Sequence, residues 1–421
     1  MSEAVKDINW KGYSIISILL IIGITLVAIY TKLWVLTAIP VGFLFGFFLK
    51  KGELCGASAM SEIPLMRDKS KAFGLWIAIV VSMVLFAAFD LMGMIKLSPK
   101  PLIYLNYIVG GVLFGIGIVL AGGCVSGCLF KSAAGNINSM VGLIGIPLGI
   151  ALVEYGYLSG FQKSMQSFVI KSQDGGPVTL SSLTGMPYWM LAAIFAVATI
   201  IWIIAGRKKN KKQNIKQDDT EVIFRTIRRP WKPWKAGIAI GVLAIFAYLS
   251  SASTGRNYPL GVTHGVLHMQ MLFTENNITY VYKKPEIKSP SSIQQAPVAA
   301  QASTGEKPVT PPAPAPKKIN LWLLLLVVSL MIGSWVSGRL SGTIEFIPRH
   351  PSQTVIAFIG GIMLGAGAAF AGGCVIGNIL SGWALMSVGN ILFGVVTILT
   401  NWATTYFYLM GGKVSDFIFN E

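Results

Sequence analysis

The amino-acid sequence predicts an all-α integral membrane protein: about ten transmembrane helices plus short re-entrant half-helices, in two inverted, pseudo-symmetric halves. Composition, a series of apolar runs and an internal repeat lead to this prediction. Of the 421 residues, 53% are hydrophobic and 12% are charged, against roughly 25% charged in soluble proteins. A water-soluble globule could not cover its surface with so few ionic groups. The composition excludes an ordinary cytosolic enzyme, a disulfide-stapled secreted domain and a disordered scaffold.

Ten runs are long and apolar enough to cross a membrane, which takes about 20 mainly apolar residues. The first run follows Lys6 and Lys11 and resembles a signal peptide, but no small-residue cleavage site follows Tyr30. We therefore expect it to remain as a span. The ten predicted spans are 14–31, 33–50, 72–93, 102–121, 137–158, 188–206, 236–253, 319–340, 353–371 and 386–410.

The distribution of positive charge predicts the orientation. Segment 206–235 is rich in Lys and Arg, and loop 50–71 contains five basic residues. Loops of this kind lie on the cytoplasmic side, and both lie an even number of spans from the N-terminus. The N-terminus is then cytoplasmic as well. The net charge of +17 is explained by membrane topology, and no nucleic-acid partner is expected.

Composition also divides the chain into parts. Residues 159–187 are predicted to form an external loop, and the Pro- and Ala-rich composition of 285–318 is typical of an extended linker. The predicted parts are an extra N-terminal span at 1–32, a first membrane half at 33–205, a basic cytoplasmic linker at 206–235, and a second membrane half at 236–421 interrupted by the loop 285–318.

The most informative feature is a repeat. Segment 110–127 recurs as 360–377, with the glycines in the same register and the same Ala-Gly-Gly-Cys-Val core. Five predicted spans lie between the two copies, so they face opposite sides of the membrane. Inverted repeats of this kind are typical of transporters, whose substrate site lies where the halves meet.

The repeated glycines fall into two groups. Gly111 and Gly115, like Gly361 and Gly365, have the spacing that allows close helix packing. The pairs Gly122-Gly123 and Gly372-Gly373 should instead break the helix, which at membrane depth requires a protein-lined cavity. The short apolar stretches that follow, 125–134 and 375–388, are expected to be half-helices. Their N-terminal ends would suit a small anion.

Cysteines stand at these predicted breaks. Cys124 and Cys374 occupy matching positions, and a thiol near a helix N-terminus is a better hydrogen-bond partner or nucleophile than an ordinary thiol. Cys55 follows span two, beside Lys50 and Lys51. The alternative is that these are small buried hydrophobic side chains, although duplication argues against it for Cys124 and Cys374. Cys128 has Asn378 as its repeat partner, so the repeat does not require a thiol there.

Other polar residues are weaker candidates. Glu154 lies inside a predicted span, where a carboxylate is a functional candidate. His264 and His268 lie on a short apolar stretch, 259–272, that we interpret as another half-helix in which they pack or line a pore. With His350 they are the three histidines, and no Cys and His residues have metal-ligand spacing. Nucleotide-binding, catalytic-triad and haem motifs are absent. We expect no metal, no cofactor and no catalytic residue.

The sequence Cys55-Gly56-Ala57-Ser58 and the doubled Gly-Gly-x3-Gly-x-Gly-x3-Ala-Gly-Gly-Cys motif resemble the YeeE/YedE family of sulfur-compound transporters, over roughly 33–158 and 236–405. The resemblance implies a bacterial or archaeal inner-membrane protein that takes up thiosulfate. It also implies that Cys55, Cys124 and Cys374 line a central path and handle the substrate by thiol hydrogen bonding without a lasting covalent bond. The second half has no cysteine equivalent to Cys55.

Other functions remain open from the sequence. Some relatives are linked to selenium or persulfide compounds, which are alternative substrates. Cys124 and Cys128 could instead form the redox pair of a membrane thiol–disulfide electron carrier, and a structural partner subunit is a third possibility. Besides the lipid bilayer, a cytoplasmic sulfur-carrier protein is a candidate partner.

Overall fold

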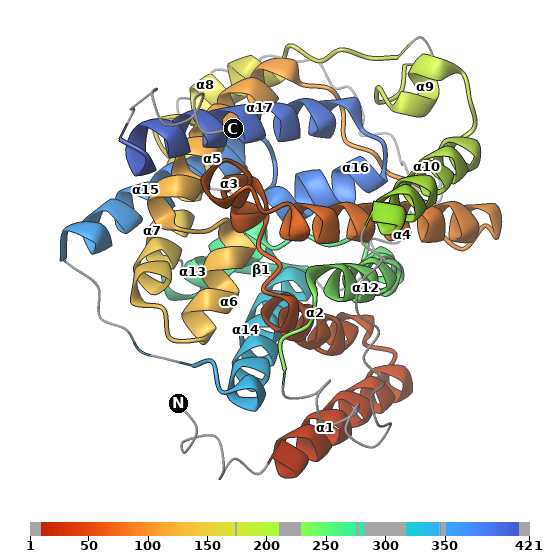
Figure 1. Cartoon of the computed structure of the whole chain (residues 1–421), viewed down its shortest axis with the longest axis vertical. Helices are drawn as coiled ribbons and strands as arrows, with labels where there is room; N and C mark the ends of the chain where they lie inside the picture. Colours follow the sequence, from red (N-terminus) through yellow and green to blue (C-terminus); the bar gives the residue numbers. More distant parts are fainter. Residues whose placement is uncertain are drawn as a thin grey trace, which may run out of the picture.

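The computed structural model describes residues 10–172, 175–209, 229–274, 278–281, 317–344, 346 and 351–411. Most of them are helical (Figure 1). Within these ranges there are two strands, β1 (Ile278–Val281) and β2 (Lys317–Asn320), which pair in parallel. The helices are α1 (Trp10–Thr31), α2 (Ala38–Gly52), α3 (Gly56–Met66), α4 (Ser70–Leu91), α5 (Tyr104–Ala121), α6 (Val125–Ala133), α7 (Ile137–Glu154), α8 (Ser159–Gln166), α9 (Leu180–Thr184), α10 (Tyr188–Lys209), α12 (Pro233–Ser253), α13 (Thr263–Thr274), α14 (Leu321–Ser341), α15 (Pro351–Phe370), α16 (Gly382–Ala384) and α17 (Val388–Thr404), with a 3-10 turn at Trp34–Thr37 and π-helical segments at Val375–Ser381 and Thr405–Leu409.

Ten helical stretches of the described chain are long and apolar enough to cross a membrane. Each contains or overlaps one of the ten predicted spans, which confirms the predicted fold class. The stretches are Ser14–Thr31, Trp34–Met66, Ser70–Leu91, Tyr104–Ala133, Ile137–Glu154, Tyr188–Ala205, Pro233–Ser253, Leu321–Ser341, Pro351–Phe370 and Val388–Leu409.

The segment 50–71 is more ordered than the loop that the sequence predicts. Helix α2 ends at Gly52, the following Glu53 has a left-handed φ of 45°, and α3 begins after Cys55. Lys51 is 1% exposed and donates to Ser341 Oγ at 2.8 Å. The predicted loop 50–71 therefore contains a helix, α3, and the helix end predicted beside Cys55 is present.

Three other expected segments differ in detail. The second predicted half-helix, 375–388, is a π-helical turn at Val375–Ser381 followed by α16. The third, 259–272, is α13 and starts four residues later. The expected external loop 159–187 contains α8 and α9. Most of the two predicted linkers, together with His350, lies outside the described residues.

The two repeat helices, α5 and α15, pack against each other in opposite directions. A Cβ placed on Gly110 would lie 2.8 Å from Ala371 N, near the end of α15. One placed on Gly117 would lie 2.5 Å from Leu364 N, and one on Gly360 would lie 2.5 Å from Ala121 N. Since the residue numbers on one helix fall as those on the other rise, the repeats are antiparallel, as the inverted topology predicts. We call this contact the glycine seam.

The second face of each repeat helix also depends on glycine. A Cβ on Gly115 would lie 2.9 Å from Thr397 O of α17, and one on Gly365 would overlap Ile146 O of α7. These contacts confirm the packing role predicted for this group of glycines. In Figure 1, α5, α7, α15 and α17 lie together in one part of the molecule, with α2, α12 and α14 in another.

The ends of the helices collect at two faces. At one, Ile170 N donates to Leu102 O at 2.9 Å, and Thr179 pairs with Ser387 in an isolated antiparallel β-bridge. We call this the Lys100 face, because Lys100 O accepts a hydrogen bond from Ser387 Oγ there. At the other, the Lys131 face, Trp231 N donates to Lys51 O at 2.8 Å. Helix α5 starts at the Lys100 face, whereas α15 ends there. The Gly-Gly breaks that follow these two helices therefore lie toward opposite faces.

Helices α1 and α10 are peripheral. The spanning window of α1 is 6% buried and that of α10 is 17% buried, against 67% for α14. Figure 1 shows both at the edge of the bundle. Side chains such as Leu19 and Ile201 are exposed, as expected for helices that face lipid. The site therefore lies among the remaining helices.

Candidate functional site

Two glycines form the first break, between α5 and α6, and each makes a different contribution to the backbone. Gly122 has a φ of 68°, a left-handed conformation that favours glycine. Gly123 N donates to Ile118 O at 3.1 Å and closes the end of α5. Cys124 is extended and precedes α6, and its thiol makes no cap hydrogen bond to this helix. The thiol is 0% exposed.

The second break, between α15 and the π-helical turn, has the same construction. Gly372 has a φ of 62°, and Gly373 N donates to Ala368 O at 2.7 Å. Cys374 is extended, precedes the next helical turn without capping it, and is 0% exposed. The predicted helix breaks are therefore confirmed at both copies of the repeat.

A lysine holds each break. Lys131 Nζ donates to Gly122 O at 2.7 Å, and Lys100 Nζ donates to Gly372 O at 2.6 Å. These carbonyls belong to helix ends, which carry partial negative charge. Lys131 lies on the half-helix of its own break, whereas Lys100 lies on the loop between α4 and α5. The lysines are not repeat partners in sequence, so the repeat alone gave no signal for them.

The fourth residue after each cysteine supports the second glycine. Cys128 Sγ donates to Gly123 O at 3.8 Å. Its repeat partner Asn378 donates through Nδ2 to Gly373 O at 2.9 Å and to Ala371 O at 3.1 Å, and its Oδ1 accepts from Lys100 at 2.8 Å. This gives Cys128 a structural role. It also argues against Cys124 and Cys128 as a redox pair, because the Cys128 thiol is directed to a carbonyl.

Cys55 lies beside the first break. Its Sγ is 3.9 Å from Cys124 Sγ, and Cys124 Sγ is 3.3 Å from Ser126 Oγ. A Cβ on Gly127 would lie 2.5 Å from Cys55 Sγ, so the absence of a side chain there makes room for the thiol. All four cysteines are free and buried. The structure thus brings two of the three predicted pathway thiols together.

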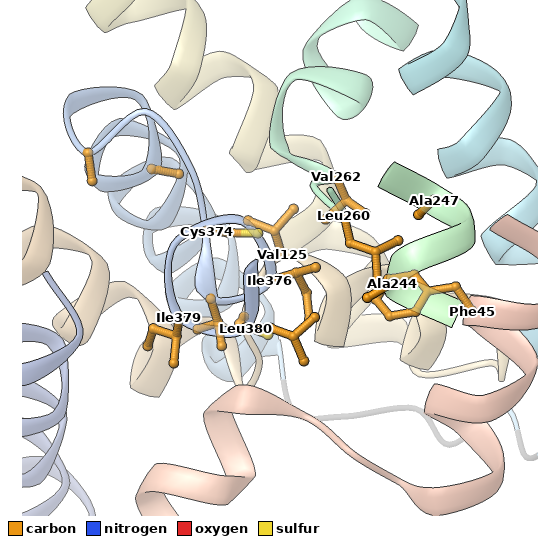
Figure 2. Packing of buried hydrophobic residues seen from close by; sticks show 14 of the residues in the cluster. Phe45, Val125, Ala244, Ala247, Leu260, Val262, Cys374, Ile376, Ile379 and Leu380 are labelled. Atoms are coloured by element: carbon orange, nitrogen blue, oxygen red, sulfur yellow. The ribbon is translucent and has the colours of Figure 1, made fainter. Parts of the chain in front are cut away.

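The third thiol lies nearby in an apolar environment. Gly56, which follows Cys55, packs against Val375, which follows Cys374. Figure 2 shows Cys374 with Val125, Ile376, Leu260 and Val262 in the buried hydrophobic cluster. These aliphatic side chains are at most 2% exposed. The centre of the protein is closed around the thiols in this structure.

Beside the second break the protein is hollow. A Cβ on Gly377, the repeat partner of Gly127, would meet nothing within 4 Å. Gly377 lines a cavity of about 200 Å³, which we call the Gly377 cavity. The residues that line it are Lys100, Arg256, Tyr258, Gly261, Thr263, His264, Leu323, Gly372, Gly373 and Gly377. The position that Cys55 fills at the first break is thus open and polar at the second.

Two cations line this cavity without a neutralising carboxylate among the described ion pairs. Burial, and secondarily the nearby Arg256 guanidinium, lower the pKa of Lys100 to about 7. Burial lowers the pKa of Arg256 to about 10. A buried cation that is destabilised in this way is stabilised by an incoming anion. The electrostatics of the cavity therefore favour a negatively charged ligand.

A second cavity of about 390 Å³ adjoins the first, since Lys100, His264 and Gly372 line both. Glu154 also lines it, at the end of α7, and its Oε1 lies 2.9 Å from His264 Nε2. His268, one turn further along α13, is 8% exposed and lines neither cavity. No group of three or more His, Cys, Asp or Glu residues with metal-binding geometry occurs among the described residues.

Comparison with known proteins identifies the family. A family model described as sulphur transport matches residues 51–403. The chain belongs to the sulphur transport family, the YeeE/YedE family. It is 26% identical over 380 residues to the thiosulfate transporter TsuA of Spirochaeta thermophila, covering 88% of this chain and 98% of the relative. It is 23% identical over 375 residues to TsuA of Escherichia coli, covering 88% and 94%.

A further relative is the probable transporter YedE of Escherichia coli, which is 28% identical over 168 residues, or 39% of each chain. As a member of the sulphur transport family with ten apolar helices, the chain is a multi-pass membrane protein that transports a sulfur compound. The family and these relatives are transporters and not enzymes.

Within this family framework, sequence reasoning located part of the site. The structure places Glu154 and His264 together beside the second break, although nothing in the sequence paired them. Lys100, Arg256 and Thr263 were missed. They lie in loops or at a helix start, where hydrophobic periodicity gives no signal. The sequence nevertheless shows Lys100 and Arg256 just outside predicted spans.

Proposed function

We propose that this protein imports thiosulfate, or a closely related small sulfur anion, across the cytoplasmic membrane along a path between the two helix breaks. The observation that carries the proposal is the pair of opposed Gly-Gly-Cys breaks with buried thiols, one of them beside a cation-lined cavity. The substrate named for the two long relatives is thiosulfate, which supports this choice of anion.

The chemistry of the ion fits this arrangement. Thiosulfate is a dianion with hard oxygen atoms and one soft terminal sulfur. The Gly377 cavity offers positive charge for the oxygens, and a thiol S–H can donate a hydrogen bond to the soft sulfur. Cys374 would receive the ion first, and Cys124 with Cys55 would receive it next. Successive thiols allow passage through an apolar centre without a covalent intermediate.

We infer the orientation in the membrane from charge. Segment 50–71 and residues 229–235 lie at the Lys131 face. The basic sequence of 206–235 predicts that this face is cytoplasmic, because positively charged loops lie in the cytoplasm. The Lys100 face and its cavities are then external, and the N-terminus is cytoplasmic. Substrate would enter beside Cys374 and leave beside Cys124 and Cys55, where a sulfur-carrier protein could receive it.

Uptake of labelled thiosulfate into proteoliposomes tests the proposal. We expect Cys374→Ala and Cys124→Ala each to lower the initial rate at least tenfold, because each removes a hydrogen-bond donor from the path. Cys128→Ser, which keeps a donor to Gly123 O, is the matched control and should keep most of the rate. Unchanged uptake in both alanine variants would show that the thiols are not the path.

Competition identifies the substrate in the same assay. Unlabelled thiosulfate should suppress uptake more strongly than selenite or a persulfide. If selenite or a persulfide is the stronger competitor, the protein carries a selenium or persulfide compound. If no sulfur or selenium anion moves, the transport proposal for the isolated chain is wrong.

A further inference from the structure

We infer that the Gly377 cavity is an oxyanion-binding site, distinct from the thiols, that binds the oxygen atoms of a tetrahedral dianion and therefore also binds sulfate. The inference rests on the proposed function, since it assigns the first selection step to this cavity and leaves recognition of the soft sulfur to Cys374. Sulfate would occupy the cavity but would proceed less readily than thiosulfate, because it lacks the soft terminal sulfur that matches the soft thiol.

The positive charge is rigidly placed. Arg256 Nη1 donates to Tyr258 O at 3.2 Å and to Pro259 O at 2.8 Å. The guanidinium also lies over the Trp322 ring, 5.1 Å from its centroid. Arginine has five N–H donors, so these contacts fix its plane and leave donors on Nη2 and Nε. Lys100 is fixed by its bonds to Gly372 and Asn378. Such preorganised cations bind an anion at little entropic cost.

A hydroxyl without a partner also points to a ligand. Thr263 lines the cavity and is 3% exposed, and among the described residues its Oγ1 has no hydrogen-bond partner. Buried polar atoms are nearly always paired in folded proteins. Thr263 is also the first residue of α13, and backbone N–H groups at a helix start bind anions. An oxygen of the bound anion would satisfy this hydroxyl.

The size of the cavity limits the ligand. At roughly 30 Å³ per water molecule, about 200 Å³ holds a five-atom anion with a few waters. A larger organic sulfur compound would have to extend into the adjoining cavity. The open space beside Gly377 belongs to this volume, whereas at the first break the equivalent space is filled by Cys55 Sγ. The oxyanion site is therefore present in one half of the protein.

Equilibrium binding of labelled sulfate to the purified full-length protein in detergent tests the inference. We expect saturable sulfate binding that thiosulfate displaces. Thr263→Val, which keeps the shape and removes the hydroxyl, and Arg256→Gln should each weaken sulfate binding at least fivefold. Gly377→Ala places a methyl group in open space, so it should fold normally and still weaken binding. Cys374→Ala should bind sulfate as the unmodified protein does.

Controls separate folding, charge and function. Lys163→Gln removes an exposed lysine of the same face and should not change the affinity for sulfate. The thermal unfolding midpoint of each variant verifies its folding. If the protein transports thiosulfate but does not bind sulfate, or if Thr263→Val and Gly377→Ala bind it normally, the inference is wrong and the proposed function stands. If sulfate binds but no thiosulfate is transported, the proposed function is wrong and the oxyanion site stands.

Discussion

The two helix breaks share a backbone and differ in what surrounds it. In both, a left-handed glycine, a second glycine and an extended cysteine occur in the same order, and a lysine bonds to the first glycine carbonyl. At the first break the adjacent space holds Cys55 and the neighbourhood is thiol-rich. At the second it is a cavity with two cations. Duplication thus preserved the geometry of the chain, while the side chains around each copy diverged.

This difference indicates a division of labour. A cation-lined cavity selects by charge and shape, whereas closely spaced thiols can only offer weak, soft hydrogen bonds. If the first step is selective and the second permissive, the two breaks cannot be interchanged. Each of the following predictions compares the two breaks directly.

We expect the largest difference in stability when Cys128, which contacts Gly123 O, and Asn378, which contacts Gly373 O, are each replaced by the other residue type. Asn378→Cys removes two donated hydrogen bonds and the acceptor for Lys100, at about 1 kcal/mol each. We expect a loss of about 2–3 kcal/mol and a lower unfolding midpoint in detergent. The reciprocal change, Cys128→Asn, keeps a donor near Gly123 O and should cost less. Equal losses would mean that the two positions are equivalent.

A methyl group should distinguish the filled space from the empty one. Gly127→Ala would place Cβ 2.5 Å from Cys55 Sγ, whereas Gly377→Ala meets nothing within 4 Å. Overpacking of this kind costs about 1–3 kcal/mol, so we expect the first variant alone to unfold at a lower temperature. Alkylation of Cys55 after mild denaturation should also be faster in Gly127→Ala. Two variants of equal stability would contradict the assignment of Cys55 to this space.

The smallest predicted effect is a pH dependence of anion binding at the second break. The pKa of Lys100 is lowered to about 7 by burial and then by Arg256, with Cys374 acting in the opposite direction. Lys100 therefore loses its charge as the pH rises through about 7, and an anion favours the protonated form. Thiosulfate should bind severalfold more weakly at pH 8 than at pH 6, as measured by equilibrium binding.

Other ionisable groups near the cavity require a control. Arg256 and Tyr258 line the same cavity as Lys100, whose Nζ lies 5.0 Å from the Tyr258 ring centroid. His264 lines both cavities, and Glu154 lines the adjoining one. In Lys100→Gln the affinity should be low at every pH, with no slope between pH 6 and 8. A slope that persists in this variant would contradict the assignment of the pH dependence to Lys100.

The sequence was sufficient to predict the spans, the inverted repeat and both breaks, because these depend on local chemistry. Apolar length defines a span, and paired glycines at membrane depth define a break. Even the separate task of Gly111 and Gly115 in packing followed from their spacing. Each span and each break is encoded within a few neighbouring residues, and the repeat is visible because the same segment recurs at 110–127 and 360–377.

The surroundings of the breaks could not be predicted in the same way. Lys100 and Gly372 are 272 residues apart, and Glu154 and His264 are 110 apart. Nothing local records such contacts, which arise when α7, α13 and the loop before α5 meet at one face. Cys55 was assigned to the path by resemblance, but its contact with Cys124 became visible only through the fold. Long-range pairing of this kind requires the structure.

The glycine seam has a consequence for the transport cycle. Because α5 and α15 touch backbone to backbone at Gly110, Gly117 and Gly360, these two helices have little freedom to slide or rock without losing dense packing. The pair of helices that precede Cys124 and Cys374 is then expected to stay rigid during transport. We therefore expect the motion that opens the path to occur in the short elements next to these helices, α3, α6 and the π-helical turn.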